Sequence, residues 1–236
     1  MTGLSLKRVT QFFIATFTAF SINGIAAVES EVTEAMLDNG MKILVKQDNR
    51  APVVVAQVWY RIGSSYEPDG ITGVSHVLEH MMFKGTSKYP KGEFNRIIAE
   101  NGGNDNAFTG RDYTAYFQTL EKSRLEVSME LESDRMRGIL LDKDEFAKEL
   151  NVVIEERRLR TEDKAESKVY EKFNEVAFPG HPYGRPVIGW MRDLEKLKVE
   201  DLHKWYQRYY SPANAVLVVV GDVEPSEVID MAKKYY

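Results

Sequence analysis

The segment "GVSHVLEHMMFKGT", residues 73–86, decides how the chain is interpreted, because it holds two of the four histidines. His76 and His80 stand four positions apart, and Glu79 directly precedes the second histidine. Residues at i and i+4 of a helix share one face, so a helix here would aim both imidazoles at one point. Two imidazoles can hold zinc, and a carboxylate beside it can take a proton from a water. The alternative is an ordinary amphipathic helix that happens to carry imidazoles.

A catalytic zinc ion needs three protein ligands and one open position, so a third donor must come from elsewhere in the chain. Because the sequence has no cysteine, that donor must be a histidine or a carboxylate. The segment "DEFAKELNVVIEERRLR" offers Glu149 and Glu156, seven positions apart and therefore on one helical face that also carries apolar residues. Glutamate-rich helices are also typical of solvent-exposed elements whose acids pair with Arg or Lys. Helix geometry alone therefore leaves Glu156 undecided.

Composition excludes several other functions. The chain of 236 residues has 43% hydrophobic and 28% charged residues, which is ordinary for a folded globular protein. Its net charge is −5 and it has no block of Lys or Arg, so we expect no nucleic-acid binding. The absence of cysteine from the sequence excludes disulfides, thiolate metal sites and cysteine nucleophiles.

Residues 1–27 have the three-part pattern of a secretory signal peptide. A short basic start precedes an apolar run over residues 12–22, and small residues end the segment at Ala26 and Ala27. We predict cleavage after Ala26 or Ala27, which would leave residues 28–236 in the periplasm or outside the cell. The apolar run is shorter than the roughly 20 residues of a membrane span, so we expect no stable span. An uncleaved N-terminal membrane anchor is the alternative.

The remaining sequence mixes strand and helix patterns. Runs of β-branched and aromatic residues predict strands in "GMKILVKQ", "APVVVAQVWYRIGS", "NDNAFTGRDYTAYFQTL" and "NAVLVVVGDV". We expect the first two to pair as a hairpin through "DNRAP", and the third to form two short strands around "GRD". Helices are predicted in "KGEFNRIIAENGG", residues 123–161 with a break near "RGILLD", residues 166–177, "KVEDLHKWYQRYY" and "EPSEVIDMAKKYY". The pattern indicates an α+β fold, with helices packed on a mixed, largely antiparallel sheet.

The order and spacing of these motifs resemble the pitrilysin family of zinc peptidases, which carry an inverted HxxEH motif. Glu156 follows His80 by 76 residues, within "ELNVVIEERR". Four more segments match in order: "RIGSSYEPDGITGVSHVLEHMMFKGT", "NGGNDNAFTGRDYTAY", "HPYGRPVIG" and "YYSPANAVLVVVGDV". The resemblance therefore covers residues 32–236.

The resemblance implies a zinc-dependent endopeptidase that hydrolyses extended or unfolded peptides. His76, His80 and Glu156 would bind one zinc ion per chain. Glu79 would be the general base acting on the zinc-bound water. Glu149 matches an additional acidic residue near the metal in the family, which would orient a ligand histidine.

The resemblance also implies a binding site for the substrate backbone at Asn106 and Ala107. In the family the matching strand holds an extended peptide by strand addition near the zinc, a grip that uses backbone hydrogen bonds. Such a grip predicts modest side-chain selectivity and substrates that are unfolded or extended. An ordinary hairpin with turn residues explains the glycines around this segment equally well.

The family builds a clamshell from two similar halves, and the resemblance covers the first half. We therefore expect residues 28–236 to be a catalytic N-terminal half-domain. The second half would come from another polypeptide, a second-half partner subunit, or the chain would be a truncated form. Either possibility predicts that the isolated chain has incomplete peptidase activity.

Two other functions fit parts of the pattern. A half-clamshell could capture peptides or assemble with a partner and stay inactive until paired. A different zinc hydrolase could also use an HxxEH helix. The complete set of His76, Glu79, His80 and Glu156 argues against a scaffold, and the surrounding family-like segments argue against an unrelated hydrolase.

Overall fold

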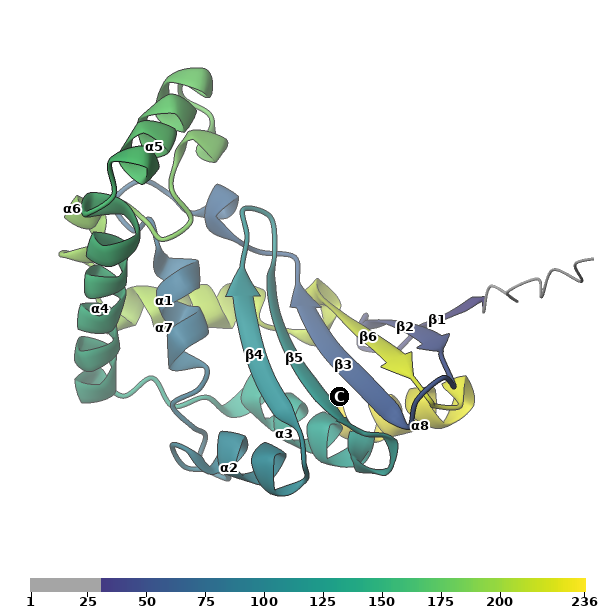
Figure 1. Ribbon diagram of the computed structural model, residues 1–236. Coiled ribbons are helices and arrows are strands. Elements are labelled where there is room, and N and C mark those ends of the chain that lie inside the picture. The colour runs from purple at the N-terminus through teal and green to yellow at the C-terminus, as the bar shows by residue number, and fades with distance from the viewer. Residues whose placement is uncertain (1–30) are drawn as a thin grey trace, which may run out of the picture.

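The computed structural model describes residues 31–236 as an α+β fold built on one six-stranded sheet (Figure 1). The strands lie in the order β1-β2-β6-β3-β5-β4. β2 and β6 run parallel, and the other four neighbouring pairs are antiparallel. The predicted mixed, largely antiparallel sheet is confirmed. The predicted signal peptide, residues 1–27, lies outside the described residues.

The strands show one error in the sequence-based topology. Their bounds are β1 Val32–Met36, β2 Lys42–Gln47, β3 Val53–Tyr60, β4 Asn104–Thr109, β5 Thr114–Glu121 and β6 Ala215–Gly221. The predicted hairpin between β2 and β3 is wrong, because β6 lies between them and pairs with both. β6 is a continuous apolar run, buried or half-buried along its length, and an interior position gives it hydrogen-bond partners on both edges. Strand β1 was not predicted.

The helices agree more closely with the sequence patterns. Their bounds are α1 Val74–Met81, α2 Glu93–Glu100, α3 Leu125–Gly138, α4 Lys143–Arg157, α5 Ala165–Ala177, α6 Met191–Leu194, α7 Val199–Tyr209 and α8 Pro225–Tyr235. The predicted break near "RGILLD" is confirmed between α3 and α4. Asp142 caps α4 by accepting hydrogen bonds from the N–H groups of Asp144 and Glu145, both at 2.9 Å.

The hydrophobic core lies between the sheet and the helices on one of its faces. Side chains alternate along β3, where Val54, Ala56, Val58 and Tyr60 are buried and the residues between them are partly exposed. Figure 1 shows α3, α7 and α8 behind the sheet, while α1, α4 and α5 lie beyond the β4 edge. The candidate site lies at this end of the fold, where residues of α1, β4, α4 and α5 line a cavity.

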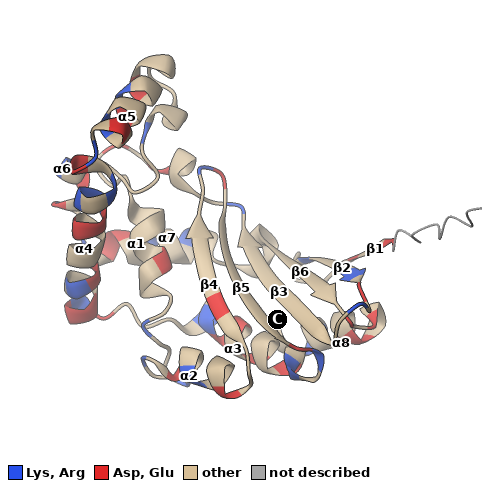
Figure 2. Ribbon diagram, viewed as in Figure 1, with Lys and Arg blue, Asp and Glu red and all other residues tan. Residues whose placement is uncertain are grey.

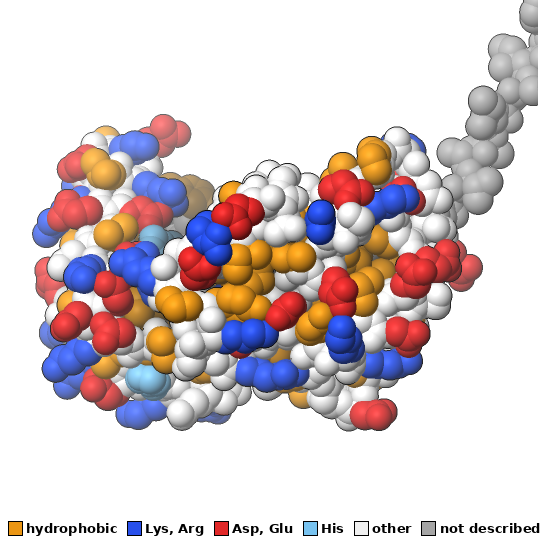
Figure 3. Space-filling model, turned by 90° about the horizontal axis from the view of Figure 1, so that it is seen from below, with side chains coloured by type: hydrophobic (Ala, Val, Ile, Leu, Met, Phe, Trp, Pro, Cys, Tyr) orange, Lys and Arg blue, Asp and Glu red, His pale blue; other side chains and the backbone are white. Residues whose placement is uncertain are grey.

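The surface carries charges of both signs. Figure 2 shows acidic and basic residues mixed along α4 and α5, and Figure 3 shows the same mixture on the face seen from below, with hydrophobic side chains between the charges. Within the part of the chain that the structure describes, no helix combines the length and the apolar character needed to span a bilayer.

Candidate metal site

Helix α1 presents its histidines because its opposite face is firmly buried. Four apolar residues at i, i+3, i+4 and i+7 have no exposed surface: Val74, Val77, Leu78 and Met81. This spacing is the buried stripe of an amphipathic helix. His76, Glu79 and His80 therefore lie together on the other side, toward α4 and β4, which both contact α1.

The side chains of His76, His80 and Glu156 converge in the structure. Their candidate donor atoms all lie within 4.8 Å of one another. Glu156 Oε2 is 3.8 Å from His76 Nε2 and 3.5 Å from His80 Nε2. Zinc bonds of about 2.1 Å at tetrahedral angles would place donor atoms about 3.4 Å apart, and both separations measured from Glu156 are close to this value. Within residues 31–236 no other group of three such side chains comes this close together.

Glu149 lies behind one of the histidines. Its Oε2 is 3.3 Å from His80 Nδ1, and its Oε1 is 2.6 Å from Lys84 Nζ. When Nδ1 carries the proton and donates it to this carboxylate, Nε2 keeps a lone pair for a metal. The structure therefore places Glu149 where it can fix the tautomer of His80.

The charge states of two of the three donors, His76 and Glu156, suit a metal. The hydrogen bond with His80 lowers the pKa of Glu156, although partial burial raises it, so the side chain stays a carboxylate. Its Oε1 is paired with Arg160 Nη1 at 2.6 Å, which leaves Oε2 to face the imidazoles. Burial and the neighbouring His80 lower the pKa of His76 to about 4, which keeps this imidazole neutral. Metal ligands must be deprotonated, and His76 and Glu156 meet that requirement near neutral pH. Burial lowers the pKa of His80, but its hydrogen bonds with Glu156 and Glu149 outweigh burial and raise it, so a metal ion would compete with a proton at this imidazole.

Glu79 lies beside the donors and bonds to the edge strand. The hydroxyl of Thr109, on β4, donates to Glu79 Oε2. Burial raises the pKa of Glu79, and the bond from Thr109 lowers it. A carboxylate with a raised pKa accepts and returns protons more readily near neutral pH than an ordinary glutamate does.

A cavity of about 1200 Å³ between β4 and α5 is lined by His76, Glu79, His80 and Glu156. Asn106 and Ala107 lie on β4, which has a sheet partner on only one side. The Gly110 N–H bonds to the Tyr113 carbonyl, and bonded pairs alternate along an antiparallel ladder. Ala107 is therefore in a non-bonded pair, and its N–H and C=O face the free edge, where the N–H donates to Asn106 Oδ1 at 2.8 Å. The Asn106 backbone faces β5, so its contribution to binding would come through its side chain.

The sequence analysis missed several residues of this site. Arg160 follows Glu156 by four positions on one helical face, a spacing that could have indicated the pair. Thr109 stands two positions after Ala107, so strand alternation places the two on the same face. Lys84 has no such local signal, because its partner Glu149 is brought to it by helix packing.

Helix α5 contributes an apolar wall that the sequence analysis did not anticipate. Val169, Tyr170 and Phe173 line the cavity and are 62–69% exposed. Large apolar side chains with this exposure, facing a cavity, are typical of a binding surface. Their spacing along the helix, at i, i+1 and i+4, places them on one face and could have indicated this apolar surface.

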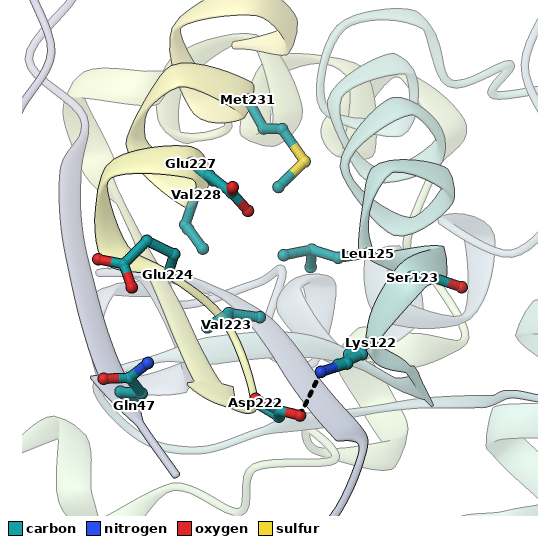
Figure 4. Close-up of a pocket in the computed structure, with 10 residues that line it drawn as sticks. All are labelled: Gln47, Lys122, Ser123, Leu125, Asp222, Val223, Glu224, Glu227, Val228 and Met231. Carbon is teal, nitrogen blue, oxygen red and sulfur yellow. Dashed lines mark hydrogen bonds and ion pairs between the residues drawn. The ribbon is translucent and has the colours of Figure 1, made fainter. Parts of the chain in front are cut away.

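Another cavity, of about 390 Å³, lies between α3 and α8 (Figure 4). Lys122 and Asp222 form an ion pair of 2.5 Å beside it, and Figure 4 shows Glu227 and Met231 pointing into it. It contains no histidine, and we assign it no chemistry. Of the two remaining histidines, His181 accepts a hydrogen bond from the Tyr183 N–H at 3.1 Å, and His203 is exposed on α7.

The fold and the donor set define a protein built around a candidate zinc site at a sheet edge. Residues 42–190 match the family described as Insulinase (Peptidase family M16), and residues 196–236 match the Peptidase M16 inactive domain. The first match covers more than half of the chain, so the chain belongs to the M16 peptidase family. The predicted resemblance to pitrilysin-type peptidases is confirmed.

Relatives support this assignment and show how much of them the chain spans. The chain is 38% identical over 201 residues to zinc protease PqqE of Helicobacter pylori, covering 85% of this chain and 45% of that protein. It is similar to the crystal structure of a protease from Helicobacter pylori, with a TM-score of 0.85, 36% identity and coverage of 88% and 50%. The periplasmic protease PqqL from Escherichia coli gives a TM-score of 0.81, 26% identity and coverage of 89% and 24%. The chain thus spans about half the length of the curated relatives it matches.

Proposed function

We propose that the chain is the catalytic part of a zinc endopeptidase that hydrolyses extended or unfolded peptides. One observation carries the proposal: the donor atoms of His76, His80 and Glu156 converge on one side of a cleft, with Glu79 beside them. The other side of the cleft ends in a free strand edge. A metal site next to an open edge is suited to acting on a peptide bound in extended form.

The metal would be held by His76, His80 and Glu156, with one zinc ion per chain. When bound, zinc lowers the pKa of a water molecule and polarises a peptide carbonyl. Glu149 holds His80 in the tautomer that leaves Nε2 free, and Arg160 holds the second oxygen of Glu156. These two contacts keep the donor atoms in place before the metal arrives.

Glu79 would act as the general base. Its carboxylate takes a proton from the attacking water and then delivers a proton to the leaving amine. The hydroxyl of Thr109 holds this carboxylate and couples it to β4, the strand that we propose holds the substrate. Base and substrate would therefore be positioned by the same strand.

The peptide would add to β4 as a further strand. The outward C=O of Ala107 would accept a backbone hydrogen bond from the peptide. The outward N–H of Ala107 would donate one once the Asn106 side chain, which accepts from it at 2.8 Å, turns to the peptide. Across the cleft, Val169, Tyr170 and Phe173 of α5 would contact apolar side chains of the substrate. Backbone pairing with a single apolar wall gives a preference for apolar residues without strict sequence selectivity.

We further propose that residues 28–236 act as one catalytic half and that a second half closes the cleft. The coverage of 45% of a curated relative and 50% of a solved relative supports a second half of similar length, because each of those chains contains about as much sequence again. We also propose a periplasmic location after removal of residues 1–27, which is the location of PqqL, a more distant relative named as a periplasmic protease. A half that binds peptides but hydrolyses nothing until paired is the second candidate.

The test begins with purified chain. The proposal expects one zinc per molecule and hydrolysis of a flexible fluorogenic peptide, which a chelator removes and zinc restores. Glu79→Gln should keep the zinc and lose the hydrolysis. Hydrolysis that appears only after a second-half protein is added would favour the paired form. Absence of zinc from folded wild-type chain, or full activity in Glu79→Gln, would refute the mechanism.

A further inference from the structure

A buried carboxylate outside the proposed ligand set closes the N-terminal end of the histidine helix. Glu67 is 2% exposed, and it precedes α1 in the loop that follows β3. Its Oε2 accepts the Gly73 N–H at 2.7 Å, and its Oε1 accepts the Ser75 N–H at 2.8 Å. The first four N–H groups of a helix have no partner within the helix. Glu67 therefore satisfies two of these groups on α1.

Helix α1 has no side-chain cap of its own. Its N-cap residue is Gly73, with φ of 92°, and no side-chain cap hydrogen bond is present there. Burial raises the pKa of Glu67 to about 7, while the hydrogen bonds from Gly73 and Ser75 lower it. The N–H groups and the positive end of the helix dipole therefore stabilise the charged form of this buried acid, together with the nearby charge of Arg185.

The position of this contact matters because the helix is short. Ser75 directly precedes His76, and α1 has only eight residues, so a shift of its first turn moves both imidazoles. For an atom about 6 Å from a helix axis, a rotation of roughly 10° moves it by about 1 Å. Zinc distances tolerate deviations of about 0.2 Å. A small rotation of α1 about its axis therefore moves the imidazole nitrogens out of bonding distance of a zinc ion.

Glu67 is itself held in place from the other side. Arg185 Nη1 donates to the Glu67 carbonyl, and Arg185 Nη2 is 2.9 Å from Asp69 Oδ1. Next to it, the Thr72 hydroxyl donates to Asp193 Oδ2 at 2.6 Å. The loop that carries Glu67 is thus fixed to the segment that follows α5, and it cannot follow α1 if α1 shifts.

We propose that Glu67 is a positioning residue, which sets the phase of α1 and so aims His76 and His80 at the metal. This inference rests on the proposed function for its metal, but the hydrogen bonds from Glu67 to α1 are independent of it. Glu67 touches neither the donors nor the cleft. Its effect should therefore appear in metal affinity and in the order of the helix, and only indirectly in turnover.

The experiment compares three variants with wild type. Glu67→Gln keeps the size and one acceptor but turns the other contact into a donor facing an N–H. Glu67→Asp keeps both acceptors on a shorter side chain and serves as the conservative variant. Glu132→Gln is the matched control. Glu132 is also a buried acid, 1% exposed, but its carboxylate bonds to Gln118 and Arg135 and not to α1. Zinc affinity is measured by competition with a chelator, and backbone hydrogen exchange is followed across residues 73–80 without metal.

The expected result is a zinc Kd raised about 10- to 100-fold in Glu67→Gln, the range typical of residues that orient ligands. Glu67→Asp should lose less, and Glu132→Gln should stay near wild type even if its melting temperature falls. Exchange across residues 73–76 should speed up in Glu67→Gln and not in Glu132→Gln. Wild-type affinity and exchange in folded Glu67→Gln would overturn the inference.

Two further outcomes remain decisive. If Glu67→Gln does not fold, Glu67→Asp carries the comparison, and wild-type affinity and exchange in that variant would overturn the inference. If wild-type chain binds no zinc, the proposed function fails. The exchange rates without metal then still decide whether Glu67 holds α1.

Discussion

The contact between Glu149 and His80 gives a sharp test of how the donor set is prepared. Glu149→Gln replaces a carboxylate with an amide that can no longer favour the Nδ1-protonated tautomer electrostatically. Removing a carboxylate that orients a ligand histidine typically weakens metal binding by about 10- to 100-fold. The contact is long, 3.3 Å, and the other oxygen of Glu149 is shared with Lys84 at 2.6 Å. We therefore expect the zinc Kd of Glu149→Gln to rise by about tenfold, the low end of this range, which corresponds to ~1.4 kcal/mol of binding free energy.

The assay is competition of a chromogenic chelator for zinc, with Glu156→Gln and Glu155→Gln measured beside it. Glu156→Gln removes a proposed ligand and should cost far more than tenfold. Glu155 is on the same helix with its side chain 59% exposed and pairs with Arg158, so Glu155→Gln should change nothing. Equal affinities in wild type and Glu149→Gln would refute the orienting role. A loss as large as that in Glu156→Gln would instead make Glu149 a ligand.

Three further predictions concern the cleft and the core. Ala107→Pro removes the N–H that faces the free edge of β4, where it donates to Asn106 Oδ1. The kcat/KM for a flexible peptide should fall about three- to tenfold, while the melting temperature changes little because no bond to β5 is lost. Asn106→Pro removes a bond to β5 instead and should lower the melting temperature. Phe173→Ala should raise KM for peptides with apolar residues. Because the residue is 62% exposed, the free energy of unfolding should change by less than about 0.5 kcal/mol. An unchanged KM would show that α5 is not part of the substrate site. Arg135→Met leaves Glu132 buried without its ion-pair partner and should cost about 3–5 kcal/mol in chemical denaturation; a neutral result would show that the pair does not stabilise the core.

Most of the secondary structure could be predicted from local sequence patterns. The helix around His76 and His80, the two strands around "GRD" and the break before Asp142 all depend on residues close in sequence. Their signals are periodicity, turn residues and a helix cap, which a short segment displays by itself. The predicted hairpin between β2 and β3 was wrong because the pairing of these strands depends on residues far away in the sequence. Whether β2 pairs with β3 or with β6 depends on a strand more than 150 residues away, which "DNRAP" cannot encode.

The sequence by itself determined the chemical groups of the candidate site: two imidazoles and a carboxylate on one helical face, a distant glutamate-rich helix, and no thiol to compete with them. Tertiary structure decided what those groups meet. Packing of α4 against α1 brought Glu156 to 3.5 Å from His80 and Glu149 to its other nitrogen. The physical reason is that covalent spacing fixes which side chains share a face, whereas burial of apolar surface between distant elements fixes which faces come together.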